Sequence, residues 1–302
     1  MDTFACFIDM RKAFDTIDRT SLLFKLSQAG ISKHLYKAIE VIYSSTECSV
    51  LVNEHLTEWF MPQSGVKQGD NLSPSLFILY IDDLARELNA KNHGIKINNE
   101  TINILMYADD IVIVAESEEN MQKMLDIVNV WCKRWRMIIN ETKSQIVHFR
   151  KKNVNRTEKI FKCGKFVIDI VTKYKYLGCI LEEHLDFNVT ANILAEGASR
   201  AVGSVVNTCI KNNNLKYSTF TKLYDTCVVP IMDYCAGVWG FSKYDKPNTV
   251  QNRAIRSFLG VHRYTSNVAI NGDMGWTMPV VRGRLCLFSL LQCIFKQENG
   301  TF

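Results

Sequence analysis

Residues 102–115 read Ile-Asn-Ile-Leu-Met-Tyr-Ala-Asp-Asp-Ile-Val-Ile-Val-Ala, and the expected fold depends most on this stretch. Two short apolar runs rich in β-branched residues flank the pair Asp109-Asp110, a pattern typical of two buried strands joined by a tight turn. Two negative charges beside an apolar sheet are unfavourable unless a cation or a partner neutralises them. Taken alone, the pair fits either a divalent metal site or an ordinary aspartate turn.

The composition is that of a globular protein large enough for two modest domains, or for one domain with an appended subdomain. The chain has 302 residues, of which 47% are hydrophobic and 22% are charged. No apolar run reaches the roughly 18 to 20 residues that span a bilayer, and the N-terminus lacks the layout of a signal peptide. We therefore expect an intracellular protein of the cytoplasm or nucleus, without a membrane partner.

Ten cysteines are scattered along the chain without a Cys-x-x-Cys pair or a Cys/His knuckle. In a chain without a secretory signal, this spacing is typical of buried or free thiols in a reducing compartment. We expect neither a disulfide framework nor a structural zinc site.

Positive charge is concentrated between Lys143 and Lys165. This segment holds eight Lys or Arg residues and only one acidic residue, Glu158, whereas the whole chain carries a net charge of +5. A local basic stretch of this kind suits a phosphate backbone, but a solvated loop gives the same pattern. The sequence leaves both interpretations open.

Periodicity and turn residues predict an alternation of strands and helices before the aspartate pair. The expected elements are a strand over 4–8 ending at Asp9, helices over 19–28 (closed by Gly30) and 34–43, and strands near 48–52 and 58–60 joined by a turn at 53–55. Ser73-Pro74 predicts a helix start with Ser73 as N-cap, and the apolar run 76–81 predicts burial on most faces.

After the aspartates, we expect a helix over 118–136 capped by Ser117, then strands over 137–140 and 145–149. This order predicts an α+β fold: an antiparallel or mixed sheet with helices on one face. Residues beyond about 185 show helical periodicity and predict a separate, mostly helical subdomain.

Asp9 closes the first expected strand. If that strand lies next to the hairpin, Asp9, Asp109 and Asp110 converge at one edge of the sheet. Three carboxylates suit two Mg²⁺ ions, which prefer carboxylate and phosphate oxygens. The alternative for Asp9 is a helix cap or an ion pair with Arg11 or Lys12.

The loop over residues 64–74 leads into the helix expected from Ser73. Its glycines allow the backbone to approach a ligand closely, a helix N-terminus favours anions, and Gln68 offers a neutral donor and acceptor. A simple capping turn explains the same residues.

Five segments together resemble motifs A to E of reverse transcriptases, in order and in approximate spacing. The Lys-Ala-Phe-Asp and Val-Lys-Gln-Gly forms are similar to the non-LTR (LINE-type) retrotransposon branch in particular. The segments are Phe7-Ile8-Asp9-Met10-Arg11-Lys12-Ala13-Phe14-Asp15, Ser64-Gly65-Val66-Lys67-Gln68-Gly69 with Leu72-Ser73-Pro74, Tyr107-Ala108-Asp109-Asp110, Asn140-Glu141-Thr142-Lys143-Ser144 and Tyr176-Leu177-Gly178.

The resemblance implies an RNA-directed DNA polymerase that uses an RNA template, a DNA primer and dNTPs. Asp9, Asp109 and Asp110 would be the catalytic metal ligands for two Mg²⁺ ions, with Mn²⁺ as an alternative. Lys143 would lie near the triphosphate as an electrostatic stabiliser or proton donor. A plain member of the basic stretch is the other interpretation of Lys143.

The resemblance also implies residues that contact substrate. Gln68, Gly69 and Tyr107 would contact the incoming nucleotide or template. Phe14 would be the steric gate that crowds a ribose 2′-hydroxyl, although a core aromatic fits the same position. The turn Tyr176-Leu177-Gly178 would be the primer grip, with an ordinary β-turn as the alternative.

The resemblance divides the chain into a palm over 1–182 and a helical thumb with a downstream segment over 183–302. In the thumb, Arg253, Arg256, His262 and Arg263 would meet a nucleic-acid backbone or form a solvated helix face. Family members carry a fingers subdomain before motif A, whereas this chain begins eight residues before Asp9. We therefore expect a partial chain.

Two functions from different classes follow. The first is a polymerase, and the second is a catalytically inactive remnant that at most binds nucleic acid or a protein partner. An RNA-dependent RNA polymerase is disfavoured by Phe14, because ribonucleotides need room for the 2′-hydroxyl.

We expect Phe14→Ala to raise ribonucleotide incorporation, because removal of the ring opens space for the 2′-hydroxyl. The measurement is the ratio of rNTP to dNTP incorporation on an RNA template. An unchanged ratio would refute the gate role and leave Phe14 as a core aromatic.

Overall fold

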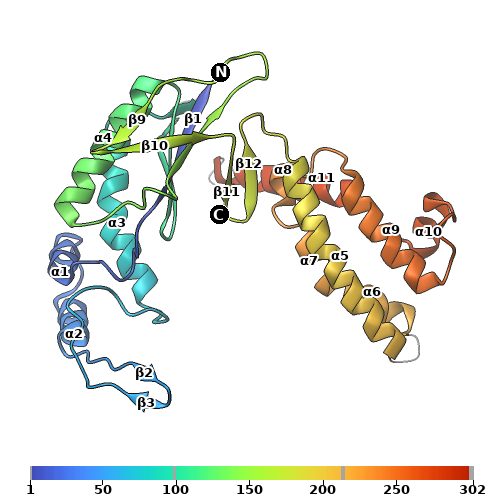
Figure 1. Cartoon of the computed structure of the whole chain (residues 1–302), viewed down its shortest axis with the longest axis horizontal. Coiled ribbons are helices and arrows are strands. Elements are labelled where there is room, and N and C mark those ends of the chain that lie inside the picture. Colours follow the sequence, from blue (N-terminus) through green and yellow to red (C-terminus); the bar gives the residue numbers. More distant parts are fainter. Residues whose placement is uncertain (1, 98–99, 212–214, 299–302) are drawn as a thin grey trace. The chain divides into compact units, whose positions relative to one another are not determined.

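The computed structural model of the chain describes residues 2–97, 100–211 and 215–298. The chain divides into two compact units, the first formed by residues 1–174 with 182–184 and the second by residues 175–181 with 185–302 (Figure 1). Each unit has its own hydrophobic core.

A six-stranded sheet organises the first unit, in the order β6-β7-β1-β8-β10-β9. The β8–β10 pair is parallel and the other neighbouring pairs are antiparallel, so the sheet is mixed. The strands are β1 (Thr3–Asp9), β6 (Ile104–Tyr107), β7 (Asp110–Ala115), β8 (Gln145–Phe149), β9 (Phe161–Cys163) and β10 (Phe166–Val171).

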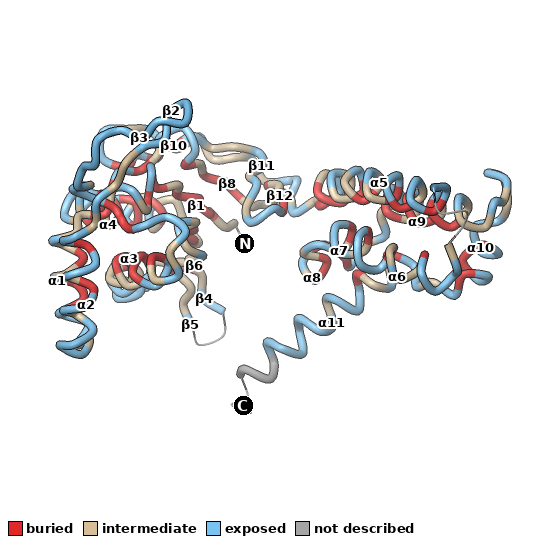
Figure 2. Tube along the Cα trace, turned by 90° about the horizontal axis from the view of Figure 1, so that it is seen from below, coloured by how far each residue is buried: buried red, intermediate tan, exposed pale blue. Residues whose placement is uncertain are grey.

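Helices cover one face of this sheet. Cys6 and Ile8 of β1 and Ile111 and Ile113 of β7 alternate along their strands and pack into one core with α3 and α4. Figure 2 shows buried positions along β1 and on α3 and α4. The α+β expectation is confirmed. The helices of this unit are α1 (Arg19–Gln28), α2 (Lys33–Ser44), α3 (Ser73–Asn89) and α4 (Glu118–Trp135).

The ends of α1 and α4 follow from their local sequence. The Asp18 carboxylate accepts the Ser21 amide at the start of α1, and the Ser117 hydroxyl accepts the Asn120 amide at 3.2 Å at the start of α4. Arg136 adopts a left-handed conformation, with φ 57°, directly after α4. Both expected helices are confirmed.

The start of α3 differs from the expectation. The N-cap position belongs to Leu72, and no side chain caps the helix. The Ser73 hydroxyl instead donates to the Lys67 carbonyl at 2.5 Å, because the preceding loop folds back over it. The apolar run is buried on most faces, as expected: Leu76, Phe77, Tyr80 and Ile81 are buried, and Ile78, at 55% exposure, marks the open face of α3.

Two strand predictions need correction. Residues 137–140 form no strand and contribute one bridge, Met10 to Ile139. The earlier hairpin is β2 (Leu51–Val52) with β3 (His55–Leu56), so its turn is Asn53-Glu54, in which both residues have positive φ. Residues 58–60 contribute only a bridge from Phe60 to Cys48.

Strands β8 and β9 and the turn into β10 run through the basic stretch, but residues 150–160 between β8 and β9 form a loop that holds five of its eight basic residues. Near its centre, Arg150 and Arg156 form ion pairs with Glu183 at 3.1 and 2.6 Å. These two charges are therefore engaged within the first unit.

The smaller strands form two-stranded sheets. Two further hairpins are β4 (Ile95–Ile97) with β5 (Glu100–Ile102), and β11 (Lys173–Tyr176) with β12 (Cys179–Glu182).

The second unit is mostly helical, as the sequence predicts. Its core includes an aromatic series in which Phe220 stacks on Phe258 at 4.4 Å and Trp276 stacks on Tyr224 at 4.1 Å. The helices are α5 (Asn188–Lys211), α6 (Tyr217–Cys227), α7 (Val229–Met232), α8 (Ala236–Trp239), α9 (Asp245–Leu259), α10 (Asn267–Met274) and α11 (Pro279–Glu298).

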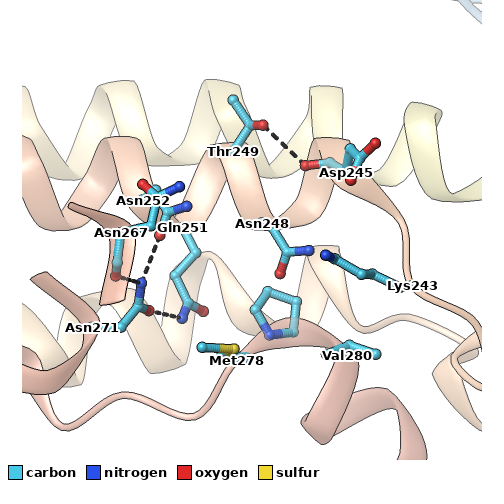
Figure 3. Close-up of a pocket in the computed structure, with 11 residues that line it drawn as sticks. Lys243, Asp245, Asn248, Thr249, Gln251, Asn252, Asn267, Asn271, Met278 and Val280 are labelled. Carbon is cyan, nitrogen blue, oxygen red and sulfur yellow. Dashed lines mark hydrogen bonds between the residues drawn. The ribbon is translucent and has the colours of Figure 1, made fainter. Parts of the chain in front are cut away.

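Buried amides join α9 and α10 in this unit. Gln251 donates to Asn271 at 3.1 Å, and Asn271 donates to Asn252 at 2.8 Å (Figure 3). Arg282 of α11 donates both to Gln251 and to Asp233. A hollow of about 380 Å³ lies beside these amides.

Within the described ranges, no single helix has the length and apolar character to cross a membrane; only α10 and α11 taken together, bent by 58°, meet that criterion.

A buried lysine joins α1 to α3 and α4. Lys25 is 7% exposed, and its ammonium group lies 2.8 Å from the Asp83 carboxylate. The ring centres of Tyr80, Trp131 and Trp135 lie 4.3, 4.8 and 3.8 Å from the same nitrogen. Burial lowers the pKa of Lys25, and Asp83 opposes that shift.

We expect Lys25→Ala to lower the free energy of unfolding by about 3 kcal/mol, because it removes the ion pair with Asp83 and the contacts of the buried ammonium group with three aromatic rings. Denaturant titration measures the change. The matched control is Arg86→Ala, whose ion pair with Asp82 is exposed and should contribute less than about 1 kcal/mol. Equal effects of the two substitutions would contradict the structural role of Lys25.

Candidate active site

Two aspartates face each other across neighbouring strands. In the antiparallel register of β1 and β7, Phe7 pairs with Val112 and Asp9 pairs with Asp110. Side chains alternate along a strand, so these four residues lie on the face opposite to α3 and α4. Directly opposed residues have Cβ atoms roughly 4.5 to 5.5 Å apart. The register therefore brings Asp9 and Asp110 together.

The third aspartate lies in the turn of the β6–β7 hairpin. Tyr107 pairs with Asp110, so Ala108 and Asp109 form a two-residue connection. Ala108 has φ 52°, a left-handed conformation that is uncommon for a residue with a side chain. Asp109 and Tyr107 are exposed. The expected hairpin is confirmed, and the turn holds Asp109 beside the opposed pair.

Electrostatic strain is concentrated on Asp110. Burial raises the pKa of this carboxyl, and the nearby charges of Asp109 and Asp9 raise it further. All three causes favour the neutral form of the carboxyl group. A cation at this position would instead stabilise its charged form.

Carboxylate oxygens are the donors that hard divalent cations prefer, so the chemistry of Asp9 and Asp110 fits such an ion. Within residues 2–97, 100–211 and 215–298, no group of three His, Cys, Asp or Glu side chains has the geometry of a metal cage. The structure therefore provides two opposed carboxylates, Asp9 and Asp110, rather than a preassembled set of three metal ligands.

A hollow lies beside the loop that precedes α3. It has a volume of about 420 Å³ and is lined by Phe14, Gln68 and Gly69, together with their neighbours in the loop. The Phe14 ring also stacks on Phe77 of α3, with ring centres 4.8 Å apart. Phe14 therefore contacts the core and also lines a cavity.

Asp15 holds this loop against the segment after β1, which the sequence did not reveal. The Gln68 amide donates to the Asp15 carboxylate at 2.9 Å. Gly65 has φ 84°, and a Cβ atom there would lie 2.8 Å from the Asp15 carbonyl oxygen. Glycine is therefore required where the two segments cross.

Arg19 is a second anchor that sequence patterns did not predict. Its guanidinium group donates to the carbonyls of Gly65, Tyr43 and Pro62 at 3.0, 2.9 and 2.7 Å. These acceptors lie 24 to 46 residues away in the chain. No local pattern connects them, so only the folded chain identifies Arg19.

Lys143 lies in the turn between Asn140 and Ser144. Its side chain is exposed, and its backbone amide donates to the Asn140 carbonyl at 3.3 Å. The same turn contacts Asp9: the Asn140 amide donates to the Asp9 carbonyl at 2.8 Å. The sequence pointed to Lys143, and the structure adds its connection to Asp9.

In the second unit, the turn between β11 and β12 consists of Leu177 and Gly178. Both residues have positive φ, 45° and 81°, as in the tight turns that suit β-hairpins. The Tyr234 hydroxyl donates to the Leu177 carbonyl at 2.9 Å, and a Cβ atom at Gly178 would lie 2.9 Å from the Tyr234 ring. Tyr176 is the last residue of β11.

The basic residues expected in the thumb are partly engaged within the second unit. Arg253 donates to the Ser199 carbonyl at 2.7 Å, and Arg256 donates to the Thr265 carbonyl at 2.9 Å. His262 and Arg263 are exposed.

The sheet carries helices on one face and opposed aspartates on the other, which is the arrangement that the resemblance to reverse transcriptases implies. A model of the family described as reverse transcriptase (RNA-dependent DNA polymerase) matches residues 1–181. That match covers more than half of the chain, which therefore belongs to the reverse transcriptase family. Enzymes of this family generally depend on a divalent metal ion.

Similar proteins include polymerases of mobile elements. The chain is 25% identical to the RNA-directed DNA polymerase from mobile element jockey of Drosophila funebris, over 89% of this chain and 30% of that protein. It is 36% identical to the Pol polyprotein of the retrotransposable element R2DM of Drosophila melanogaster, over 40% of this chain and 12% of that protein. The chain thus spans less than a third of these relatives.

Among solved structures, apo telomerase from Candida Tropicalis is 14% identical, with a TM-score of 0.47, over 89% of this chain and 43% of that one.

We expect Asp110→Asn to raise the free energy of unfolding by about 0.5 to 1 kcal/mol at pH 7 in chelator, because it removes a like-charge pair between strands. The raised pKa means that the folded protein holds this proton more tightly than the unfolded chain. The penalty is therefore complete above the folded pKa, shrinks as the pH falls through it, and is lost below the ordinary pKa of an unfolded aspartate.

Denaturant titrations at pH 7 and in acid test this sign. The control is Asp169→Asn, because Asp169 of β10 is paired with Gln145 rather than with an acid. Destabilisation by Asp110→Asn at pH 7 would contradict the electrostatic account.

Proposed function

We propose that the chain is part of an RNA-directed DNA polymerase of a non-LTR (LINE-type) retrotransposon. It would transfer nucleotides from dNTPs to the 3′-hydroxyl of a DNA primer on an RNA template. One observation carries the proposal: Asp9 and Asp110 are opposed on the face of the sheet that lies away from α3 and α4. Family membership supports the same reaction.

The chemistry rests on the three aspartates. Asp9, Asp109 and Asp110 would hold two Mg²⁺ ions, with Mn²⁺ as an alternative, which when bound activate the primer hydroxyl and stabilise the leaving pyrophosphate. The raised pKa of Asp110 supports this role, because like charges in close proximity need a cation.

The hollow beside Gln68 and Gly69 would receive the sugar of the incoming nucleotide. The ring of Phe14 lines this hollow, where it would crowd a 2′-hydroxyl and favour deoxynucleotides. Tyr107 would contact the nucleotide from the hairpin. The stack of Phe14 on Phe77 supports a fixed gate, because packing restricts the motion of the ring.

Two further segments would hold the remaining charged groups. The exposed ammonium group of Lys143 would stabilise the triphosphate or donate a proton to pyrophosphate. The turn of Tyr176, Leu177 and Gly178 would hold the primer terminus. The RNA template and the DNA primer would be the nucleic-acid partners. The reaction would take place in the cytoplasm, the nucleus or both.

A non-catalytic fragment that binds nucleic acid or a protein partner is the second candidate. A specific observation favours it: the β2–β3 segment exposes a run of large apolar side chains, which is typical of surfaces that contact another body. The residues are Val50, Leu51, Val52, Leu56, Trp59, Phe60 and Met61.

We expect the chain to extend a primer on an RNA template with Mg²⁺ and dNTPs. The rate should be highest in a longer version that carries, at its N-terminus, the fingers subdomain that the family resemblance implies. Asp109→Ala should lower the rate by about a hundredfold or more, because it removes a metal ligand. The control is Asp126→Ala, an exposed carboxylate on α4. Absence of primer extension by both the short and the extended chain would refute the polymerase proposal and favour the second candidate.

A further inference from the structure

Asp9 lies just past the end of the β1–β8 ladder. The paired residues of that ladder run from Thr3 with Phe149 to Phe7 with Gln145. Before Gln145 the chain leaves the strand and forms the turn of residues 140–144. The backbone amide and carbonyl of Asp9, which face away from β7, therefore need hydrogen-bond partners that are not part of β8.

The turn supplies both partners. The Asp9 amide donates to the Ser144 hydroxyl at 3.1 Å. The Asp9 carbonyl accepts the Asn140 amide at 2.8 Å. Ser144 is 1% exposed, so its hydroxyl is withdrawn from solvent. A side chain thus replaces the ladder bond two residues past the last β1–β8 pair.

The same turn is closed on itself. The amides of Ser144 and Lys143 both donate to the Asn140 carbonyl, at 2.9 and 3.3 Å, and the Thr142 hydroxyl donates to the Asn140 side-chain oxygen at 2.9 Å. Lys143 therefore extends from a short, internally bonded turn whose two ends are fixed to Asp9.

Tyr174 closes the assembly from the face that carries the aspartates. Its ring stacks on Phe7, with centres 4.2 Å apart and planes 13° from parallel. Its hydroxyl donates to the Lys143 carbonyl at 3.4 Å. Burial raises the pKa of Tyr174, and the charges of Asp9 and Asp110 add to the shift, so the hydroxyl keeps its proton.

We propose that Ser144 is a positioning residue, whose hydroxyl fixes the backbone of Asp9 and ties it to the turn that carries Lys143. This inference rests on the proposed function and deepens it. The carboxylate of Asp9 and the ammonium group of Lys143 are drawn from segments 134 residues apart in sequence, and Ser144 sets the separation of their backbones. Displacement of a reacting group by about 1 Å costs on the order of a hundredfold in rate.

The test compares Ser144→Ala, Ser144→Thr and Ser117→Ala. Ser144→Ala removes the acceptor of the Asp9 amide, and Ser144→Thr keeps a hydroxyl there. Ser117→Ala removes a hydroxyl that also accepts a backbone amide, but at the start of α4. This control reports on the general loss of one such bond.

Two measurements are made on each variant. The first is hydrogen exchange of the Asp9 amide, which needs no catalysis: we expect Ser144→Ala to accelerate it about tenfold, because the bond is lost. The second is primer extension per folded molecule: we expect a fall in kcat of about tenfold or more, with KM for dNTP nearly unchanged. Ser144→Thr should restore both values, and Ser117→Ala should change neither.

Two results would overturn the inference. One is exchange of the Asp9 amide in Ser144→Ala at the wild-type rate. The other is a fall in kcat that is equal in Ser144→Ala and Ser117→Ala, which would reduce Ser144 to a structural role. Absence of extension in the wild type, short or extended, would instead refute the proposed function, while the exchange measurement still decides whether Ser144 anchors Asp9.

Discussion

The opposition of Asp9 and Asp110 across β1 and β7 is the constraint on which the rest of the first unit depends. The same register pairs Ile8 with Ile111 and Cys6 with Ile113, and these side chains form the core under α3 and α4. A shift by one residue would turn the apolar set away from the helices. The packing of the core therefore forces Asp9 and Asp110 to lie opposite each other. The two charges cannot move apart by a change of register without loss of the core packing.

The segments around this pair are held by polar groups that act on backbone atoms. The guanidinium group of Arg19 binds three carbonyls near the loop before α3, and the Asp15 carboxylate accepts the Gln68 amide. On the other side, Ser144 takes the amide of Asp9. Such bonds fix loops that have few apolar contacts of their own. The side chains on these loops therefore stay close to the sheet, although the loops are not strands of it.

The second unit has an independent basis. Its aromatic series and its amide cluster around Gln251 join helices that lie far apart in the sequence, and the hydrogen bonds of Gln251 are made inside that cluster. The family match ends at residue 181, before α5 begins. The family match therefore lies almost entirely in the first unit, whereas the similarity to the jockey polymerase, over 89% of the chain, extends into the second.

The sequence by itself determined the elements whose signals are local: α1, α4 with its Ser117 cap, the hairpin at Asp109, and the ordered motifs. It failed where local patterns compete with the fold, as at Ser73, whose hydroxyl turns to the Lys67 carbonyl instead of capping α3. Only the tertiary structure decided that Asp9 faces Asp110 and that Ser144 and Arg19 anchor the site. The physical reason is sequence separation: the Ser144 bond joins residues 135 apart, and the Arg19 bond to Gly65 joins residues 46 apart. Such contacts depend on the packing of the whole unit and leave no periodic trace in the chain.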